Sequence, residues 1–379
     1  MKLVACVLSL KNEVMSSRKM IEIDGSIGEG GGQVLRTSLA LAAVLRREVR
    51  IFNIRAGRAE PGLKAQHLTS VKAVAEICSA SSKGLQIGST EFIFSPGGIK
   101  AGSFRFDVGT AGSITLVLQT LMPLLPFLPG ATELEITGGT DVKWSPPIDY
   151  LRLVTLPLLA KIGVHASVLV SRRGHYPKGG GVVRLTANPN SVLKSIIGVA
   201  RGDVTSIEGV SHSVKLPTRV AERQAAAATR VIEERGFPRP RIRIEASENV
   251  SHLGPGSGIV LCALTSNGGL LGGDSLGERG RLAEAVGEDA GRKLVEESGS
   301  GAFLDKHMGD MIVPYVALAE GVSDVSVSQV TPHTLTNVEV AEQVTGVSFD
   351  PLPQVGTPGR LRVKGLGLRR EEVCVSPRE

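Results

Sequence analysis

Three segments of the chain repeat one order of hydrophobic and polar positions. Each starts with an apolar helix flanked by glycine, and a short strand, a polar loop and a second helix follow. The apolar helices read GQVLRTSLALAAVLR, GSITLVLQTLMPLLPFL and GDMIVPYVALAEG, and the strands after them lie in RIFNIRAG, ELEITGG and DVSVSQV. Because two helices can cover one face of a small sheet, the pattern predicts three units whose helices bury one another.

The pattern breaks between residues 203 and 297. This stretch predicts a strand in VTSIEGVSHSVKL, a helix in RVAERQAAAATRVIEERG, strands in RIRIEAS and GIVLCALTS, and a helix in RLAEAVGEDAGRKLVEESG. We therefore predict a mixed α/β (α+β) fold with an inserted α/β domain at 203–297. The three-unit body then consists of residues 20–202 and 298–379, and residues 1–19 form an N-terminal extension.

Charge and cysteine usage limit the functional class. Forty-three Lys and Arg against 37 Asp and Glu leave a net charge of +6, which favours an anionic partner. Aromatic residues make up only 3% of the chain, too few for long stacking platforms on single-stranded nucleic acid. Cys6, Cys78, Cys262 and Cys374 are far apart and form no CxxC pair, which indicates a reducing compartment and argues against a zinc site or a disulfide framework.

Neither a secretory signal nor a membrane span is expected. The opening MKLVACVLSLKNEVMSSRK has a short apolar run without a small-residue cleavage site after it. The most apolar stretch, LVLQTLMPLLPFL, contains Gln119, Pro123 and Pro126, which is typical of a buried helix. We therefore expect a cytoplasmic protein that does not enter a membrane.

A charged residue interrupts the first apolar helix. Arg36 lies near the start of a helix that is otherwise small or apolar all round, so burial requires an anion beside it. An internal carboxylate and a ligand phosphate both remain open as that anion. The preceding IEIDGSIGEGGG predicts a strand, a glycine-rich turn and a helix, which present backbone N–H groups to a phosphate. Glu29 within these glycines is either a solvated turn residue or the ligand of a metal that bridges to phosphate.

The loop in IRAGRAEPGLKAQH carries Arg55 and Arg58, followed by Gln66 and His67 in the next helix. Two arginines three residues apart can bind phosphates in a forked manner, although an exposed basic loop is the simpler interpretation. His67 falls on the apolar stripe of its helix, which favours a hydrogen-bonded core histidine. Gln66 lies off that stripe, and we predict that it is free to face a ligand.

Further candidates lie near the carboxyl end. We predict that Asp310 caps the helix that follows it, that His307 lies in a loop, and that His333 lies in the loop of TPHTLTN. An isolated loop histidine is more often structural than catalytic, so composition alone gives His333 no role. The histidines at 165, 175, 212 and 252 form no H-x-x-x-H or H-E pair, and their spacing predicts no metal cluster.

Several segments taken together resemble one family, the RNA 3'-terminal phosphate cyclases. They are IEIDGSIGEGGGQVLR, RAGRAEPGLKAQHL, GSITLVLQTLMPLL, HYPKGGGVV and TPHTLTNVEVAE, and the likeness runs from about Met20 to about Phe349. The resemblance implies three units of a four-stranded sheet with two helices, plus a smaller inserted domain of thioredoxin-like topology. It also implies a ligase that uses ATP to convert the 3'-phosphate end of RNA into a 2',3'-cyclic phosphate.

The resemblance implies a covalent mechanism in which His333 attacks the α-phosphate of ATP. The histidinyl-AMP then passes AMP to the RNA 3'-phosphate, and the neighbouring 2'-OH closes the ring and expels AMP. The residues that match the family's ATP-contacting positions are Gln119, His307, Met308, Gly309, Asp310 and Met311. Those that match phosphate-binding positions are Arg36, Arg55, Arg58, Gln66 and His67. Glu29 matches the ligand of Mg²⁺ (or Mn²⁺), whereas His307 stands where a tyrosine is common.

Two other functions remain as alternatives, a non-catalytic cyclase-like scaffold in ribosome biogenesis and an enolpyruvyl-type transferase. The scaffold relatives lack the histidine that corresponds to His333. A transferase would not need His333 together with the RAGRAEPG and GEGGGQ segments. We therefore expect an enzyme whose partners are ATP and RNA 3'-phosphate ends, and the sequence leaves its oligomeric state open.

Overall fold

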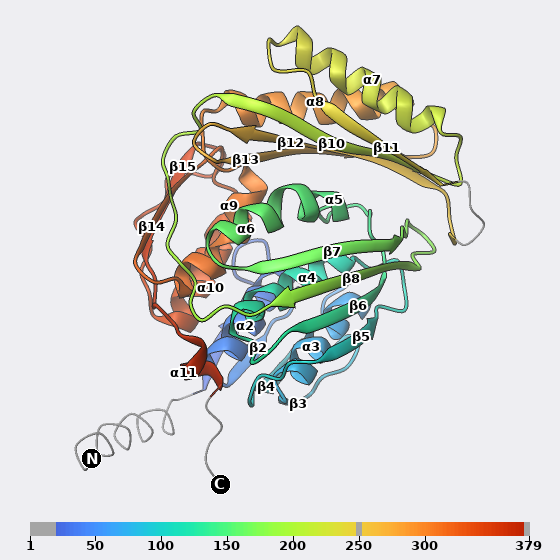
Figure 1. Cartoon of the computed structure of the whole chain (residues 1–379). Coiled ribbons are helices and arrows are strands. Elements are labelled where there is room, and N and C mark those ends of the chain that lie inside the picture. Colours follow the sequence, from blue (N-terminus) through green and yellow to red (C-terminus); the bar gives the residue numbers. More distant parts are fainter. Residues whose placement is uncertain (1–19, 248–251, 375–379) are drawn as a thin grey trace, which may run out of the picture.

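The computed structural model describes residues 20–247 and 252–374, and the predicted extension at 1–19 lies outside this range. The described residues form a mixed fold of helices and four β-sheets, which confirms the predicted α+β class (Figure 1). None of the helices in this part of the chain is long and apolar enough to cross a membrane.

The first two sheets have the same strand order and pairing. Their orders are β1-β2-β4-β3 and β5-β6-β8-β7, and in each sheet the first pair is parallel and the other two are antiparallel. The bounds are β1 Ile21–Asp24, β2 Val49–Phe52, β3 Ser81–Lys83, β4 Phe92–Ser95, β5 Ser103–Asp107, β6 Thr132–Gly138, β7 His165–Arg172 and β8 Gly181–Asn188. A helix connects the strands of each parallel pair, as a parallel crossover requires.

The third sheet differs from the four-stranded prediction because it has three strands. Its order is β15-β14-β9, with bounds β9 Ile197–Gly198, β14 Val322–Val327 and β15 Gly359–Lys364. The segment before β15 reads FDPLPQVGTP and forms a single β-bridge with the sheet among the described residues, between Phe349 and Val363. Its three prolines lack an N–H group and cannot continue a ladder, which explains the missing strand.

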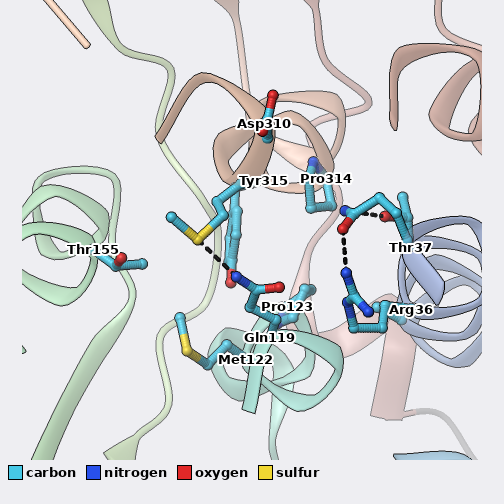
Figure 2. Close-up of a pocket in the computed structure, with 12 residues that line it drawn as sticks. Arg36, Thr37, Gln119, Met122, Pro123, Thr155, Asp310, Pro314 and Tyr315 are labelled. Atoms are coloured by element: carbon cyan, nitrogen blue, oxygen red, sulfur yellow. Dashed lines mark hydrogen bonds between the residues drawn. The ribbon is translucent and has the colours of Figure 1, made fainter. Parts of the chain in front are cut away.

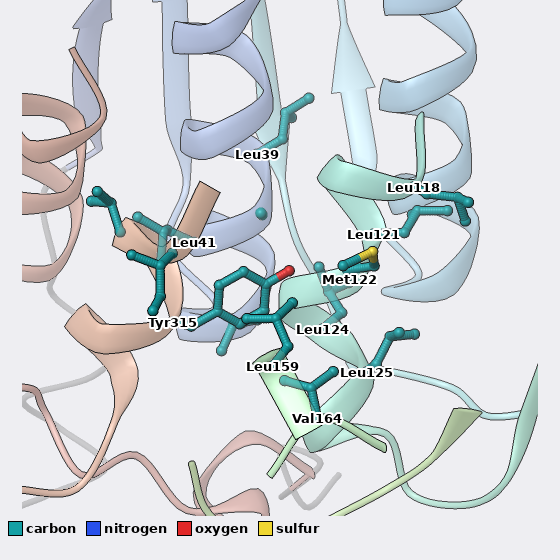
Figure 3. Close-up of a cluster of buried hydrophobic side chains, with 14 of the residues drawn as sticks. Leu39, Leu41, Leu118, Leu121, Met122, Leu124, Leu125, Leu159, Val164 and Tyr315 are labelled. Carbon is teal, nitrogen blue, oxygen red and sulfur yellow. The ribbon is translucent and has the colours of Figure 1, made fainter. Parts of the chain in front are cut away.

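The helices of the body meet at its centre. Their bounds are α2 Gly32–Leu45, α3 Ala65–Ile77, α4 Ile114–Leu121, η1 Met122–Phe127, α5 Ile148–Tyr150, η2 Leu151–Thr155, α6 Leu156–Lys161, α9 Lys306–Leu318, α10 Pro332–Thr345 and α11 Arg370–Cys374. Helix α2 contacts α3, α4, α9 and α10. Figure 3 shows Leu39 of α2, Leu121 of α4, Leu159 of α6 and Tyr315 of α9 in one buried cluster. Helices from all three segments therefore share one core.

One helical run contains a π-helical turn next to the inserted part. Helices α5, η2 and α6 are continuous, and Pro157 near the start of α6 has no N–H group to donate to the carbonyl of Leu153. That carbonyl instead accepts a hydrogen bond from Cys262 Sγ of strand β12 at 3.3 Å. The turn thus connects the body to the inserted sheet.

The inserted part has its own sheet and core. Its elements are β10 Val204–Val214, α7 Arg219–Glu234, β11 Arg241–Ser247, β12 Gly256–Thr265, β13 Leu270–Leu276 and α8 Ala283–Gly299. The strand order is β11-β10-β12-β13, and α7 and α8 cover the face of the sheet turned away from the body (Figure 1). Strand β13 was not predicted, because LLGGDSL reads as a glycine-rich turn.

The glycines of β13 allow close packing on both faces of this sheet. A Cβ at Gly272 would lie 2.3 Å from the ring of Tyr150, and one at Gly273 would lie 2.6 Å from Leu294 N. Any larger residue would push the strand away from α5 on one side or from α8 on the other. The glycines that made this strand look like a turn in the sequence therefore allow it to pack between α5 and α8.

Candidate active site

His333 lies in the first turn of α10, and the prediction that it lies in a loop is wrong. Thr331 is the N-cap, its hydroxyl accepts a hydrogen bond from Thr334 N at 3.0 Å, and Pro332 opens the helix. Threonine at the N-cap and proline at the first helical position both favour a helix start here. The N-terminus of a helix attracts anions, so the imidazole is placed where a phosphate would bind.

The glycine-rich turn after β1 lies against this helix. Glu29 Oε2 is 3.4 Å from His333 Nδ1 and 3.8 Å from Arg58 Nη2. Gly28 makes the approach possible, because its φ is +60° and a Cβ there would lie 2.1 Å from the hydroxyl of Thr336. The fold thereby brings Glu29, Arg58 and His333 together, and all three side chains remain partly exposed.

Arg36 has no carboxylate partner among residues 20–247 and 252–374. Its Nη2 donates to the neutral amide oxygen of Gln33 at 2.5 Å, and its buried Nε has no hydrogen-bond partner in this range. Burial lowers the pKa of Arg36 to about 10. The internal-carboxylate alternative is therefore not found in the described chain, and the guanidinium remains available to an anionic ligand.

His67 is a buried neutral donor beside the start of α2. Its Nδ1 accepts a hydrogen bond from Lys64 N at 3.2 Å, which leaves the ring proton on Nε2. Burial, together with Arg36, Arg55 and Lys64, lowers the pKa of His67 to about 3. A Cβ at Gly32 would lie 2.4 Å from His67 Nε2 and 3.1 Å from Arg36 Nη1, so both donors converge on the first residue of α2.

Two of the predicted phosphate-binding residues already make structural contacts. Arg55 has a φ of +56°, and its Nη1 donates to the carbonyls of Glu60 at 2.7 Å and Gly62 at 3.0 Å, which shapes its own loop. The side-chain oxygen of Gln66 accepts a hydrogen bond from Ser113 N at 3.0 Å. The prediction that Gln66 is free to face a ligand is thus wrong for its oxygen.

Asp310 does not cap its helix, because α9 already begins at Lys306 with Asp305 as its N-cap. Asp310 lies inside that helix, and its Oδ1 accepts hydrogen bonds from the hydroxyls of Thr331 at 2.5 Å and Thr334 at 2.6 Å. Burial raises the pKa of Asp310, although these two hydrogen bonds act in the opposite direction. The carboxyl group therefore braces the start of α10, the turn that carries His333.

Asn337 connects this arrangement to α2. Its amide donates to the carbonyl of Asp310 at 2.7 Å, and its oxygen accepts from Gln33 Nε2 at 2.7 Å and from Thr37 Oγ1 at 2.6 Å. The sequence patterns predicted no role for Gln33 or Asn337 in the site. The one signal for Asn337 was its position four residues after His333, a spacing that a loop interpretation of TPHTLTN concealed.

A pocket between α2, α4, η1 and α9 holds four of the predicted residues, Arg36, Gln119, Asp310 and Met311 (Figure 2). Gln119 Nε2 donates to Met311 Sδ at 2.9 Å. The remaining lining residues are Gln33, Thr37, Ala40, Met122, Pro123, Thr155, Pro314 and Tyr315. Apolar helices from all three body segments thus line the pocket, together with the guanidinium group of Arg36.

The other predicted ATP contacts lie outside this pocket. Met308 is fully buried in the core, and a Cβ at Gly309 would lie 2.8 Å from Val327. His307 lies in the first turn of α9 rather than in a loop; it is exposed and meets the ring of Tyr150 edge to face at 6.2 Å. In this structure, therefore, the side chain of Met308 faces the core and His307 faces solvent.

Known proteins similar to this chain belong to one family. The family described as RNA 3'-terminal phosphate cyclase matches residues 27–350. A protein of that name from Ignicoccus hospitalis is 51% identical over 354 residues, which cover 93% of this chain and 100% of the relative. Proteins of the same name from Hyperthermus butylicus and Methanopyrus kandleri are 51% and 49% identical, over 92% of this chain and 98% and 99% of theirs. The solved structure of EPSP synthase from Acinetobacter baumannii matches 92% of this chain and 66% of its own, with 15% identity and a TM-score of 0.28.

Proposed function

The chain belongs to the RNA 3'-terminal phosphate cyclase family, and from that premise we propose that it converts RNA 3'-phosphate ends into 2',3'-cyclic phosphates with ATP. The observation that carries this proposal is the position of His333 at the N-terminus of α10, with Glu29 3.4 Å from its Nδ1. A neutral imidazole is a competent nucleophile near pH 7.

The first step forms a phosphoramidate. With the ring proton on Nδ1, facing the Glu29 carboxylate, the lone pair of His333 Nε2 attacks the α-phosphorus of ATP. A nitrogen–phosphorus bond forms, the bond from the α-phosphorus to the bridging oxygen breaks, and pyrophosphate leaves. Glu29 holds the imidazole orientation and stabilises the positive charge that develops on the ring.

Three donors around the start of α2 fit the phosphate groups. Arg36 has no carboxylate partner in the described chain, His67 presents Nε2–H beside it, and Arg58 lies next to Glu29. Fixed donors of this kind stabilise the charge that develops in phosphoryl transfer. Arg36 also lines the pocket formed by Gln119, Asp310 and Met311; this pocket holds little more than a water molecule, and we propose that it widens to contact the adenosine.

Glu29 fits a divalent cation in the manner typical of Mg²⁺ sites with phosphate substrates. Mg²⁺ (or Mn²⁺) is commonly held by one or two carboxylates together with phosphate oxygens and water. Glu29 is a partly exposed carboxylate within the turn that faces His333. When bound there, the cation would neutralise charge on the triphosphate.

The next two steps consume the adenylate. A 3'-phosphate oxygen of RNA attacks the phosphorus of histidinyl-AMP, and the nitrogen–phosphorus bond breaks to restore His333. The vicinal 2'-OH then attacks the activated 3'-phosphorus, loses its proton and expels AMP. Because the two groups sit on one ribose, this closure benefits from a high effective molarity.

The test is labelling with ATP that carries a radioactive α-phosphate. The wild-type chain should retain label that is labile in acid and stable in base, as expected for a phosphoramidate, whereas His333→Ala should retain none. His165→Ala, at an exposed position of β7, is the matched control and should label like the wild type. Equal labelling of the His333→Ala variant would refute the nucleophile.

A second measurement separates adenylylation from cyclisation. An RNA ending in a 3'-phosphate should yield the cyclic product, while a DNA 3'-phosphate end can accept AMP but has no 2'-OH for closure. A cyclic product from DNA would contradict the last step. Label retained without any cyclisation of RNA would favour a scaffold that has kept only nucleotide chemistry.

A further inference from the structure

Two histidines and an aspartate meet in the interior where the inserted part joins the body. Asp141 follows strand β6, His175 lies between β7 and β8, and His212 belongs to β10 of the insert. The three side chains come from separate parts of the chain, and all are buried. Their separation in sequence explains why residue spacing predicted no metal cluster.

The donor atoms of this cluster form a compact triangle. His175 Nε2 is 3.1 Å from His212 Nε2, and each of these nitrogens is 3.9 Å from Asp141 Oδ2. The point equidistant from the three corners lies about 2.1 Å from each, within the roughly 2.0–2.2 Å that Zn²⁺ keeps to histidine nitrogen and carboxylate oxygen. The spacing therefore suits one small cation without a large movement of its ligands.

The second atom of each polar group in the cluster has no partner. Asp141 Oδ1, His175 Nδ1 and His212 Nδ1 are buried and make no hydrogen bond with the described residues. A buried carboxylate oxygen without a partner is uncommon, so Asp141 Oδ1 is available to a cation, whereas the two Nδ1 atoms lie on the far side of their rings from the triangle and carry the ring protons when Nε2 is the ligand. A cation bound to the triangle leaves Asp141 Oδ1 as a natural fourth ligand.

The surroundings hold the two rings in place. Glycines of β12 lie against them: a Cβ at Gly256 would lie 2.1 Å from His175 Cγ, and one at Gly258 would lie 3.0 Å from His212 Cε1. Thr140 Oγ1 donates to Asp141 Oδ2 at 2.7 Å, which helps to orient the carboxylate. Such preorganisation around the ligands is typical of metal sites.

The charged groups around the cluster are paired with one another. Arg173 contacts the cluster, with Nη1 3.2 Å from Asp141 Oδ2, and it also pairs with Asp149 and Glu245 at 2.6 Å each. Arg152 pairs with Asp149 at 2.7 Å and Arg243 pairs with Glu245 at 2.6 Å, so three carboxylates here face three guanidinium groups.

We propose that Asp141, His175 and His212 form a structural Zn²⁺ site that fastens the inserted part to the body. Two imidazoles and a carboxylate are a donor set that suits Zn²⁺ better than Mg²⁺, which prefers oxygen ligands alone. The site is separate from Glu29 and takes no part in the proposed reaction. Because two ligands belong to the body and one to the insert, bound Zn²⁺ cross-links the two parts.

The experiment uses the full-length chain without a histidine tag. The protein is stripped of metal with a chelator, dialysed, and titrated with ZnCl₂ in competition with a chromogenic chelator. Its metal content is measured by inductively coupled plasma mass spectrometry. We expect about one Zn²⁺ per chain and a higher melting temperature with Zn²⁺ than without it. His175→Ala and His212→Ala should each bind at least about 100-fold more weakly, since loss of an outer-shell partner alone costs 10- to 100-fold.

His165→Ala keeps both rings and serves as the matched control, which should bind like the wild type. If a ligand variant fails to fold, the titration and the melting shift of the wild-type chain still decide the matter. A stripped wild-type chain that binds no Zn²⁺ would overturn the proposal and leave the two rings as a hydrogen-bonded pair. Equal Zn²⁺ binding by the two histidine variants and the wild type would overturn it as well.

Discussion

Replacing Arg36 with methionine separates the cost of a buried charge from its use in binding. Burial lowers the pKa of Arg36 from 12.5 to about 10, and each pKa unit corresponds to about 1.4 kcal/mol, so the fold carries this charge at a cost of about 3 kcal/mol. Arg36 as a residue is only half-buried although its Nε is buried, and solvent screening reduces that figure to about 1–2 kcal/mol. The ligand-free Arg36→Met variant should therefore be more stable than the wild type by about 1–2 kcal/mol.

The pH dependence of the Arg36 charge decides the pH at which stability should be measured. A lowered arginine pKa means that the charge destabilises the fold at every pH below about 10, and that relief comes only between pH 10 and 12.5. Urea denaturation at pH 7.5 therefore measures the full effect. Lys72→Met, at an exposed position of α3, controls for the general effect of losing a positive charge and should change stability by less than about 0.5 kcal/mol.

Activity should move in the opposite direction. Removing one preorganised donor from a developing phosphoryl charge typically costs about 100- to 1,000-fold in rate, so Arg36→Met should label slowly with ATP or cyclise RNA slowly. Two results would contradict these expectations. A variant less stable than the wild type would mean that the guanidinium has a partner within the fold, and a stable variant of normal activity would remove Arg36 from the phosphate site.

Two further substitutions test the geometry around His333 and His67. Gly28→Ala places a Cβ at φ +60° and 2.1 Å from the hydroxyl of Thr336, so it should lower stability by about 1–2 kcal/mol and slow adenylylation at least about 10-fold. Gly98→Ala is the control, because a Cβ at Gly98 has no heavy atom within 4 Å. Equal effects of the two substitutions would contradict the role of the turn. In the folded protein His67 stays neutral down to about pH 3, whereas in the unfolded chain it takes up a proton below pH 6.5. The free energy of unfolding therefore decreases as the pH falls below 6.5. Between pH 7 and 5 the wild type should lose about 2 kcal/mol more than His67→Gln in urea denaturation, and parallel losses would show that the ring is not buried as a neutral donor.

Local patterns predicted the parts of the fold that depend on near neighbours in the chain. The apolar helices α2, α4 and α9 follow from their hydrophobic positions, and the glycine-rich turn with Glu29 follows from its composition. Strand β13 could not be predicted in this way, because Gly272 and Gly273 are explained only by Tyr150 and Leu294 on either side. Without the two packing surfaces, the glycines at this position favour a turn over a strand.

The candidate site was predicted residue by residue from the family resemblance, but its internal contacts were not. Asp310 was expected to cap α9, whereas it accepts hydrogen bonds from Thr331 and Thr334 of α10. Gln66 was expected to face a ligand, yet its oxygen holds Ser113 N. Both differences have one cause: a polar side chain takes the partner that tertiary packing supplies, and that partner lies at a distance in the sequence that no local spacing encodes.

The site exists only when the first and last segments of the body pack together. Gln33 and Thr37 of α2 bond to Asn337 of α10 across about 300 residues of sequence, and Gly28 meets Thr336 of the same helix. These contacts set the distance between Glu29 and His333, so a change that loosens α2 against α10 should slow adenylylation before it unfolds the chain. Helix α10 thus carries the proposed nucleophile, while its position is determined by α2 and by the buried carboxyl group of Asp310.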